Sequence, residues 1–404
     1  MATDPDREVW IVGAKRTAFG AFGGTLKDAK ATDLGQAAAV AAIAQSGVPS
    51  QDFDQVIFGC VGQTTPEDIY CARHVGLLAG LPVGVPALTV NRLCGSGFQS
   101  LISAAQEIRT GDAQVCLVGG TESMSLAPHA VRGARWGLPL GKAPPLDDLL
   151  WSTLTDTYAG CSMGETAENV ASLRGITRAD ADAYALSSQQ RWAAADRAGH
   201  FADELIPFPV KTRKGPISFG RDEHPRPDTS AESLAKLTPV FRPGGTVTAG
   251  TASGISDGAA ALVVVSRAFA EAKGLKPLGR LLAWGVAGVE PKLMGLGPVP
   301  AIQMALQRAS LSLSQVDLFE VNEAFAPQVL AVIRELGLPT DRTNVNGGAL
   351  ALGHPLGASG ARIAGHLLYE LGRRGARVGV GAACIGGGQG IAVILESLLY
   401  GPMS

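Results

Sequence analysis

Three residues that lie far apart in the chain have the chemical types that covalent catalysis requires: Cys94, His354 and Cys384. A thiol becomes a strong nucleophile when a neighbouring base takes its proton, and an imidazole is the usual base near neutral pH. Cys384 lies just before three consecutive glycines at 386–388. Consecutive glycines leave backbone N–H groups unshielded, as an oxyanion hole requires. These residues predict a nucleophile, a base and a site that stabilises developing negative charge.

Cys94 lies where a strand pattern changes into a helix pattern. In ALTVNRLCGSGFQSLISAAQEIRTG an apolar strand is followed by apolar residues at helical spacing, namely Phe98, Leu101, Ile102, Ala105 and Ile108. Gly95 and Gly97 would permit a sharp turn, and the free N–H groups and dipole of the helix start would then favour the thiolate of Cys94. The alternative is a small buried hydrophobe, which is the expectation for Cys60, Cys71 and Cys116.

His354 lies between Gly353 and Pro355, just ahead of a periodic helix. Proline disfavours helical geometry in the residue before it, so the imidazole is expected in a loop that points into a cavity. An imidazole beside the thiol could accept its proton. The alternative for His354 is a capping or packing histidine, and His366, inside the helix, is expected to be structural.

Two rival motifs fit the sequence less well. GVGAAC lacks the third glycine and the following helix of a dinucleotide-binding fingerprint. Gly254, Ser256 and Gly258 match the GxSxG elbow of α/β-hydrolases, with Asp317 and His354 in a possible triad order. That elbow requires a helix after the serine, whereas the strand-like AAALVVVS follows here. A serine hydrolase is therefore the weaker hypothesis.

Short apolar segments separated by helical patterns predict an α/β protein with buried strands and crossover helices. The strand segments are VWIVG near the start, QVIFG at 55–59, VCLVGG at 115–120, ALVVVS at 261–266, LFEV at 318–321 and RVGVGAAC at 377–384. Residues 124–252 are richer in Pro, Gly and charged residues and predict an inserted, loop-rich subdomain. Within it, Thr177 followed by Asp180 is a helix N-cap signal. The outer segments hint at an internal duplication.

Composition excludes several classes of protein. A net charge of -2 and a pI near 6.3 give no polybasic field for nucleic acid or an anionic membrane surface. The apolar runs are too short to span a bilayer, and MATDPDREVWIVGAKR lacks the regions of a signal peptide. The six cysteines form neither a CxxC pair nor a zinc pattern, so we expect reduced thiols and no metal. A cytoplasmic protein is the expectation.

Five motifs, in order, resemble those of the thiolase family: NRLCGSG, TAGTASGISDGAA, VNEAFAP, NVNGGALALGHPLGASG and CIGGGQG. The resemblance covers essentially the whole chain and is nearest to mitochondrial-type 3-ketoacyl-CoA thiolases and their bacterial relatives. It implies the thiolase fold, a duplicated five-layer α/β/α/β/α arrangement. The implied ranges are 1–123 with 253–278 for the N-terminal half, 124–252 for a loop domain that binds CoA and makes oligomer contacts, and 279–404 for the C-terminal half. The implied assembly is a homotetramer, a dimer of dimers, or a dimer.

The resemblance also implies an acyltransferase mechanism. Cys94 would attack the keto carbon of a 3-ketoacyl-CoA, and His354 would accept its proton. Cys384 would protonate the departing acetyl-CoA enolate in cleavage, or remove the methyl proton of acetyl-CoA in condensation. The N–H groups of Cys94 and Gly386 would stabilise the acyl-enzyme thioester oxygen. Asn322, through a held water, and His354 would stabilise the enolate oxygen. Considered alone, Asn322 could equally be a turn-forming residue.

CoA and acyl-CoA are implied as substrates, with no permanently bound cofactor. The residues implied in holding them are Arg226, Ser233, Ala249 and Ser253 for CoA, and Met163, Met294, Ala324 and Phe325 for the pantetheine and acyl region. The chain departs from short-chain members, which often carry a histidine beside the methionine, because GCS precedes Met163 here. This departure leaves the acyl-chain length open. Cys161 could line the pocket, although a packing role is favoured.

Two further alternatives stay open. A decarboxylating ketoacyl synthase shares the fold and nucleophile but is expected to carry a second catalytic histidine at the position of Asn322. A non-catalytic CoA or lipid carrier would tolerate loss of the thiols, whereas this chain keeps both cysteines and the histidine. The direction of the reaction in the cell, degradation or condensation, is not set by these residues, because the equilibrium belongs to the reactants.

Overall fold

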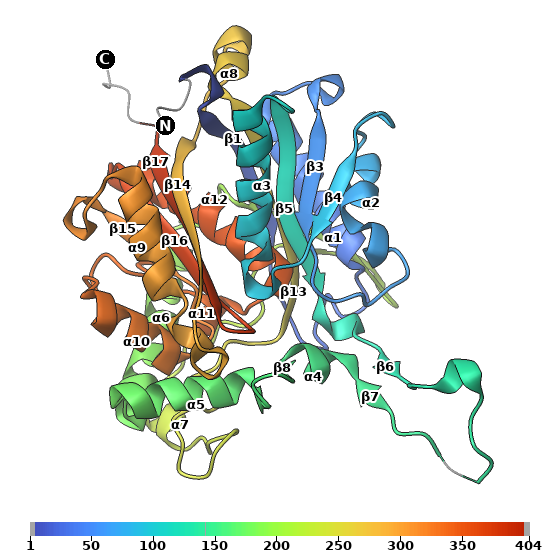
Figure 1. Ribbon diagram of the computed structural model, residues 1–404, viewed down its shortest axis with the longest axis vertical. Helices are drawn as coiled ribbons and strands as arrows, with labels where there is room; N and C mark the ends of the chain where they lie inside the picture. The colour runs from blue at the N-terminus through green and yellow to red at the C-terminus, as the bar shows by residue number, and fades with distance from the viewer. Residues whose placement is uncertain (1–4, 142, 400–404) are drawn as a thin grey trace.

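A mixed sheet of eleven strands runs through the part of the chain that the computed structural model describes, residues 5–141 and 143–399. Nine strands follow the order β15-β16-β17-β14-β1-β13-β5-β3-β4, and the short strands β10 (Leu205–Ile206) and β2 (Gly20–Ala21) pair with β1 and β13. Figure 1 shows two halves of this sheet, with the N-terminal strands on the right and the C-terminal strands on the left.

The first half of the sheet contains β1 (Val9–Thr17), β13 (Ser256–Ser266), β5 (Val115–Ser123), β3 (Gln55–Gly59) and β4 (Ala87–Val90). Every residue of β5 and β13 is buried. Strands that are covered on both faces have continuous apolar runs instead of alternating ones, which explains why these segments could be identified from the sequence.

The second half contains β14 (Gly279–Gly288), β17 (Gln389–Ser397), β16 (Val378–Ile385) and β15 (Leu318–Val321). It joins the first half through a short antiparallel pairing of Val9–Ile11 in β1 with Gly279–Leu281 in β14. All six strands that the sequence predicts are present, and the predicted α/β fold is confirmed.

The two halves repeat one strand topology. β13 runs antiparallel between β5 and β1, as β17 does between β16 and β14. β3 pairs in parallel with β5, as β15 does with β16. The parallel pairing of β3 with β4 also has a counterpart, a parallel bridge between Phe319 of β15 and Thr343. The strand pairing therefore shows the internal duplication that the sequence only hints at.

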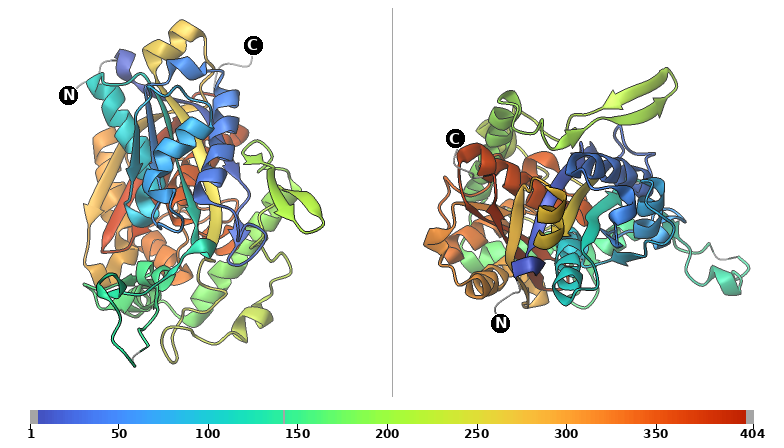
Figure 2. Two further views of the ribbon diagram at one scale, coloured as in Figure 1. Left: turned by 90° about the vertical axis from the view of Figure 1, so that its right-hand side faces the viewer. Right: turned by 90° about the horizontal axis from the view of Figure 1, so that it is seen from above.

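Helices cover both faces of each half and produce five layers (Figures 1 and 2). α3 (Ser96–Thr110) and α12 (Leu356–Arg374) form the central layer, and their apolar residues share one core with β5, β13, β16 and β17. α1 (Ala31–Ser46) and α2 (Cys71–Leu78) pack on the outer face of the first half. α9 (Pro298–Ala309) and α10 (Ala326–Leu336) pack on the outer face of the second. α8 (Arg267–Lys273) follows β13.

Glycines allow the two central helices to touch. A Cβ at Gly97 of α3 would lie 2.5 Å from the backbone N of Ala361, and one at Gly360 of α12 would lie 2.3 Å from the backbone N of Phe98. Contacts this short exclude any side chain, so both positions require glycine. The close helix pair brings the N-terminal ends of α3 and α12, and the residues just before them, to one place.

A long segment between β5 and β13 leaves the layered body. It contains α4 (Leu149–Thr153), α5 (Met163–Arg174), α6 (Arg178–Arg197), α7 (Ala231–Ala235) and the two-stranded pairs β6 (His129–Ala130) with β7 (Asp147–Asp148), β8 (Thr155–Asp156) with β9 (Cys161–Ser162), and β11 (Phe208–Thr212) with β12 (Gly215–Phe219). The β6–β7 arm and the β11–β12 hairpin project from the body (Figures 1 and 2). Thr177 caps α6 in a reciprocal capping box with Asp180, as predicted.

The exact boundaries of the three predicted ranges stay a prediction, and residues 1–4, 142 and 400–404 of those ranges lie outside the described residues. These include the first four residues of the N-terminal segment MATDPDREVWIVGAKR, which is expected not to be a signal peptide. Within the described residues, no helix combines the length and apolar character needed to cross a membrane.

Candidate active site

Cys94 sits in a sharp turn between β4 and α3. A single 3-10 turn, Leu93–Gly95, leads directly into the helix. Leu93 has a φ of 46°, in the left-handed region that non-glycine residues seldom occupy. The sequence-based attribution of this turn to Gly95 and Gly97 is wrong. Gly95 has a φ of -90° and is needed instead for packing, because a Cβ there would lie 2.6 Å from Ile385 Cδ1.

The protonation state of Cys94 also differs from the expectation. Burial raises the pKa of the Cys94 thiol to about 11, and the Glu122 carboxylate adds to this rise. Hydrogen bonds from the backbone N–H groups of Gly386 and Cys94 lower the pKa but do not offset burial. The predicted resting thiolate is therefore wrong, because the helix start is too weak to compensate for desolvation. A base must remove the proton during the reaction.

Alkylation of Cys94 should accordingly follow the thiolate fraction. We expect the rate of inactivation by iodoacetamide to rise about tenfold per pH unit between pH 6 and 10, because the thiol titrates above this range. The measurement is the pH profile of inactivation, with Cys94→Ser as the control that identifies the modified residue. A rate that levels off above pH 7 would contradict a neutral resting thiol.

His354 is held as a neutral imidazole whose Nε2 carries the lone pair. Its Nδ1 lies 2.6 Å from Ser359 Oγ, and that hydroxyl donates to Pro355 O at 2.8 Å. The hydroxyl therefore accepts from Nδ1–H, which leaves the Nε2 lone pair as an acceptor. Burial, with a smaller contribution from Arg362, lowers the pKa of His354 to about 3. His354 is therefore unprotonated at any pH at which the protein works.

Asn322 lies directly beside His354. It follows β15, and its Nδ2 is 3.3 Å from His354 Nε2. Its Oδ1 is buried and has no hydrogen-bond partner in the part of the chain that the structure describes. A buried unpaired acceptor is costly, so this oxygen suits an ordered water or a ligand donor.

Cys384 lies near the end of β16 and is fully buried. It packs in one apolar cluster with Met294 and Ala324, against which Met163 and Phe325 also pack. Burial raises the pKa of Cys384 well above its ordinary value, and a charge on Cys94 raises it further. The second effect shows that the two sulfurs lie within electrostatic reach of each other. The next residue but one, Gly386, points its N–H toward the Cys94 sulfur.

A cavity of about 290 Å³ opens in front of Cys94 and His354. Eight of the thirteen predicted site residues line it: Cys94, Met163, Ala249, Ser253, Met294, Ala324, Phe325 and His354. Cys384, Asn322 and Gly386 do not line it but contact or face residues that do. The sequence did not single out Trp151, Leu154, Val240 and Phe241, which also line the cavity. Trp151 lies in the five-residue helix α4 and the other three lie in loops, so no periodic pattern marks them.

Two predicted CoA residues lie away from the cavity. Arg226 is exposed, and its backbone N–H donates to the side chain of Gln189 at 2.9 Å. Ser233 is exposed and forms the capping box of α7 with Ser230. The structure does not bring either side chain to the cavity, and their contact with CoA stays a prediction. Cys161, on β9, also does not line the cavity.

The serine hydrolase hypothesis fails on geometry. Ser256 opens β13, so a strand follows it instead of a helix. Asp317 accepts hydrogen bonds from the backbone N–H groups of Arg377 and Val378, at the start of β16. Ser256 Oγ lies 2.8 Å from His224 Nε2 and accepts from the backbone N–H of His354 at 3.0 Å. The hydroxyl therefore supports the backbone that carries His354.

We expect Ser256→Ala to leave kcat within about threefold of the native value. His354 N–H still donates to Gly254 O at 3.0 Å, so the loop keeps one of its two anchors. Loss of the buried hydroxyl should lower the free energy of unfolding by about 1–3 kcal/mol. Steady-state kinetics and chemical denaturation of the same preparation measure both effects. If Ser256→Ala lost as much turnover as Cys94→Ser, the result would support the hydrolase hypothesis.

Among the described residues, no group of three or more His, Cys, Asp or Glu side chains is arranged to hold a metal ion. The described polar groups of the cavity region are thiols, an imidazole, an amide, the hydroxyls of Ser162, Thr248 and Ser253, and backbone N–H groups. Such a set can form a thioester, transfer a proton and bind an oxyanion.

Comparison with known proteins agrees with this chemistry. The N-terminal thiolase domain matches residues 9–268 and the C-terminal thiolase domain matches residues 275–397. The chain is 55% identical over 391 residues to the human mitochondrial 3-ketoacyl-CoA thiolase, covering 97% of this chain and 98% of that protein. It is 50% identical over 390 residues to the acetyl-CoA acetyltransferase of Pseudomonas aeruginosa, covering 96% and 99%.

Solved structures give the same result. The crystal structure of human mitochondrial 3-ketoacyl-CoA thiolase superposes with a TM-score of 0.96 at 55% identity, covering 98% of this chain and all of that chain. Its complex with CoA gives a TM-score of 0.94 at 54% identity, covering 97% and 98%. Several of these relatives are named mitochondrial, so the expected cytoplasmic location is not supported. The chain belongs to the thiolase family.

Proposed function

We propose that this protein cleaves a 3-ketoacyl-CoA with CoA, giving acetyl-CoA and a shortened acyl-CoA, or runs the reverse Claisen condensation. The observation that carries the proposal is the convergence of Cys94 and His354 on one apolar cavity, with Cys384 behind the Met294 and Ala324 side of its wall. In this proposal each of the three groups carries out one step of that reaction.

The nucleophilic step begins with a neutral thiol, Cys94, and a neutral base, His354. Cys94 Sγ attacks the keto carbon while its proton passes to His354 Nε2, which carries the lone pair and which the Asn322 amide also faces at 3.3 Å. The keto oxygen becomes negatively charged, and the N–H groups of Cys94 and Gly386, which already face the sulfur, stabilise it. No resting charge separation is required, which suits a site where burial disfavours both ions.

Carbon–carbon cleavage then needs an acid. The tetrahedral adduct collapses, the bond between the α-carbon and the keto carbon breaks, and its electron pair forms the enolate of acetyl-CoA. Cys384, whose pKa is well above its ordinary value, is a neutral thiol that can protonate the α-carbon. Protonated His354, with a water held by Asn322, would stabilise the enolate oxygen. The thiol of a second CoA then attacks the acyl thioester on Cys94. Its proton restores the Cys384 thiol, and the departing Cys94 sulfur takes back the proton held by His354.

CoA would enter between the loop segment and the body. Ala249, Ser253 and Phe325 lie on the cavity wall, where small residues leave room for a narrow pantetheine arm. A thiolase of 54% identity has been captured with CoA, which supports CoA as the ligand. Arg226 and Ser233 would reach the nucleotide end of the ligand, outside the cavity. The loop domain 124–252 would also make the contacts of a homotetramer.

The alternatives have less support. A decarboxylating ketoacyl synthase is expected to carry a second catalytic histidine where Asn322 stands, and Asn322 here bonds to His354, the one histidine among the described residues that line the cavity. A non-catalytic carrier has no need for two thiols and a base on one cavity. Participation in fatty acid β-oxidation and a cytoplasmic location both remain predictions about the cell.

The deciding experiment is a comparison of kcat/KM across 3-ketoacyl-CoA substrates from four carbons upward, in the cleavage direction. Thiolytic cleavage of any of them, with an acyl group trapped on Cys94, supports the proposal. Turnover of a malonyl-acyl carrier protein in place of thiolysis favours the synthase. The chain-length profile also settles the substrate range, which Cys161 and the GCS segment leave open.

A further inference from the structure

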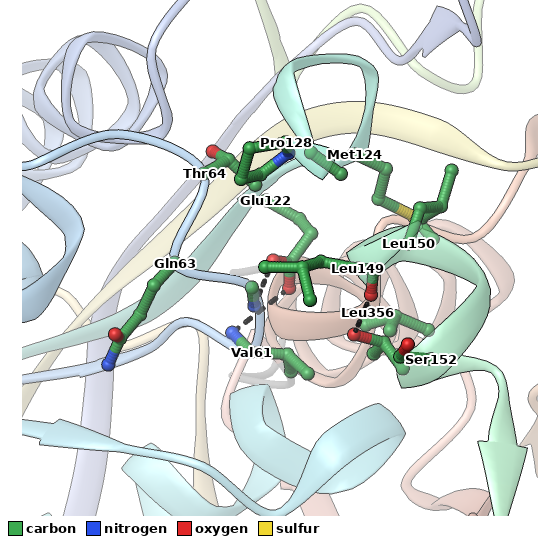
Figure 3. Close-up of a pocket in the computed structure, with 13 residues that line it drawn as sticks. Val61, Gln63, Thr64, Glu122, Met124, Pro128, Leu149, Leu150, Ser152 and Leu356 are labelled. Carbon is green, nitrogen blue, oxygen red and sulfur yellow. Dashed lines mark hydrogen bonds between the residues drawn. The ribbon is translucent and has the colours of Figure 1, made fainter. Parts of the chain in front are cut away.

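Glu122, on β5, is a buried carboxylate outside the predicted catalytic set. Only 1% of it is exposed, and no cationic side chain pairs with it among the described residues. Three backbone N–H groups hold it instead, from Val61, Gly62 and Gly357. Figure 3 shows the carboxylate of Glu122 beside Val61. Burying a charge without a cationic partner costs free energy of folding. A carboxylate held by N–H groups alone is therefore a candidate for a specific role.

One contact of Glu122 reaches the segment that carries the base. Its Oε2 accepts from Gly357 N at 2.8 Å, in the first turn of α12. His354 precedes Gly357 by three residues. The helix start has little freedom around this bond, since a Cβ at Gly120 would lie 1.8 Å from Gly357 O. The carboxylate thus fixes the point where the His354 loop becomes helix.

The other contacts reach the turn that carries the nucleophile. Glu122 accepts from Val61 N at 3.2 Å and from Gly62 N at 2.8 Å. Val61 O accepts from Asn91 Nδ2 at 3.3 Å, and Asn91 Oδ1 accepts from Leu93 N at 3.0 Å. Leu93 is the left-handed residue just before Cys94. A continuous chain of hydrogen bonds therefore runs from Glu122 to the strained turn.

We propose that Glu122 is a positioning residue that fixes the Cys94 turn relative to the His354 loop. The proposal rests on the proposed function, in which a proton passes between these two side chains. A displacement of about 1 Å between reacting groups lowers a reaction rate by about 100-fold. Because Glu122 is linked by hydrogen bonds to both the Cys94 turn and the His354 loop, its loss should have a large effect on the rate of proton transfer. The same carboxylate raises the pKa of Cys94, which shows that it lies within electrostatic reach of the sulfur.

The test measures acetyl transfer from acetyl-CoA to Cys94 by rapid quench and mass spectrometry, with CoA affinity measured separately. It is made at pH 8.5, because burial raises the pKa of Glu122 to about 7 and the charged form must predominate. We expect Glu122→Ala to slow acetylation about 100-fold, and Glu122→Gln, which keeps one acceptor oxygen, about tenfold. The Kd for CoA should stay within twofold.

The second variant breaks only the path of hydrogen bonds from Glu122 to the Cys94 turn. Asn91 is exposed, so Asn91→Ala should fold normally and slow acetylation about tenfold. Because both residues act along one path, Glu122→Ala combined with Asn91→Ala should be about as slow as Glu122→Ala alone. Asp317→Asn is the matched control, a carboxylate that also holds two backbone N–H groups but at the start of β16, away from Cys384. It should leave acetylation unchanged.

The outcomes distinguish a failure of the proposed function from a failure of the positioning role of Glu122. If the native protein forms no acyl-Cys94, the proposed function fails. If the native protein is acetylated and Glu122→Gln and Asn91→Ala react at the native rate, the positioning role is overturned. Losses that multiply in the double variant, or a parallel loss in Asp317→Asn, overturn it as well, since they indicate independent or merely structural effects.

Discussion

Replacement of Cys94 by serine should lower kcat for thiolysis by at least about 10⁴-fold and eliminate the covalent acyl-enzyme. A serine hydroxyl is a far weaker nucleophile than a thiol at the same position, and its ester would not exchange readily with CoA. His354 cannot compensate, because burial lowers its pKa to about 3 and makes it a weak base in the resting site. Initial rates, with mass spectrometry of the quenched enzyme, measure both losses.

Cys161→Ser provides the matched control for Cys94→Ser. Cys161 is only half-buried and does not line the cavity, so its variant should retain native kcat and acyl-enzyme formation. Turnover retained by Cys94→Ser, or lost by Cys161→Ser, would contradict the assignment of the nucleophile.

The buried strands could be predicted from the sequence because their environment is uniform. β13 and β5 are covered on both faces, so each reads as one apolar run. The two-residue strands β2 and β10 could not be predicted, because a pair of residues has no periodicity and pairs only where the tertiary fold places a neighbouring strand. The pairing of β1 with β14, which joins the halves, depends on the fold in the same way.

For the site, residue types and flanking turns were sufficient to identify Cys94 and His354, but not their protonation states. The helix start is visible in the sequence and favours the thiolate, whereas burial, which determines the pKa of Cys94, is a property of the whole fold. The same limit applies to Glu122. Its bond to Gly357 joins residues 235 positions apart, and no local pattern pairs them.

The second large effect is expected at Cys384. Cys384→Ala should slow exchange of the methyl protons of acetyl-CoA with deuterated solvent by about 100- to 10,000-fold, the usual contribution of a positioned acid or base. Burial gives Cys384 a raised pKa, so at neutral pH it holds the proton that an enolate needs, and no other described thiol packs in that cluster. Deuterium incorporation followed by NMR measures the exchange.

The Cys384→Ala variant should still transfer an acetyl group from acetyl-CoA to Cys94, because thioester exchange breaks no carbon–carbon or carbon–hydrogen bond. Cys94 and His354 keep their cavity positions in this variant, and the N–H of Gly386 is a backbone group that the substitution leaves in place. Exchange at the native rate would assign the α-proton to another group. Loss of acetyl transfer together with exchange would show that Cys384 supports the cavity wall instead of moving a proton. Only the separation of the two rates identifies Cys384 as the acid and base at the α-carbon.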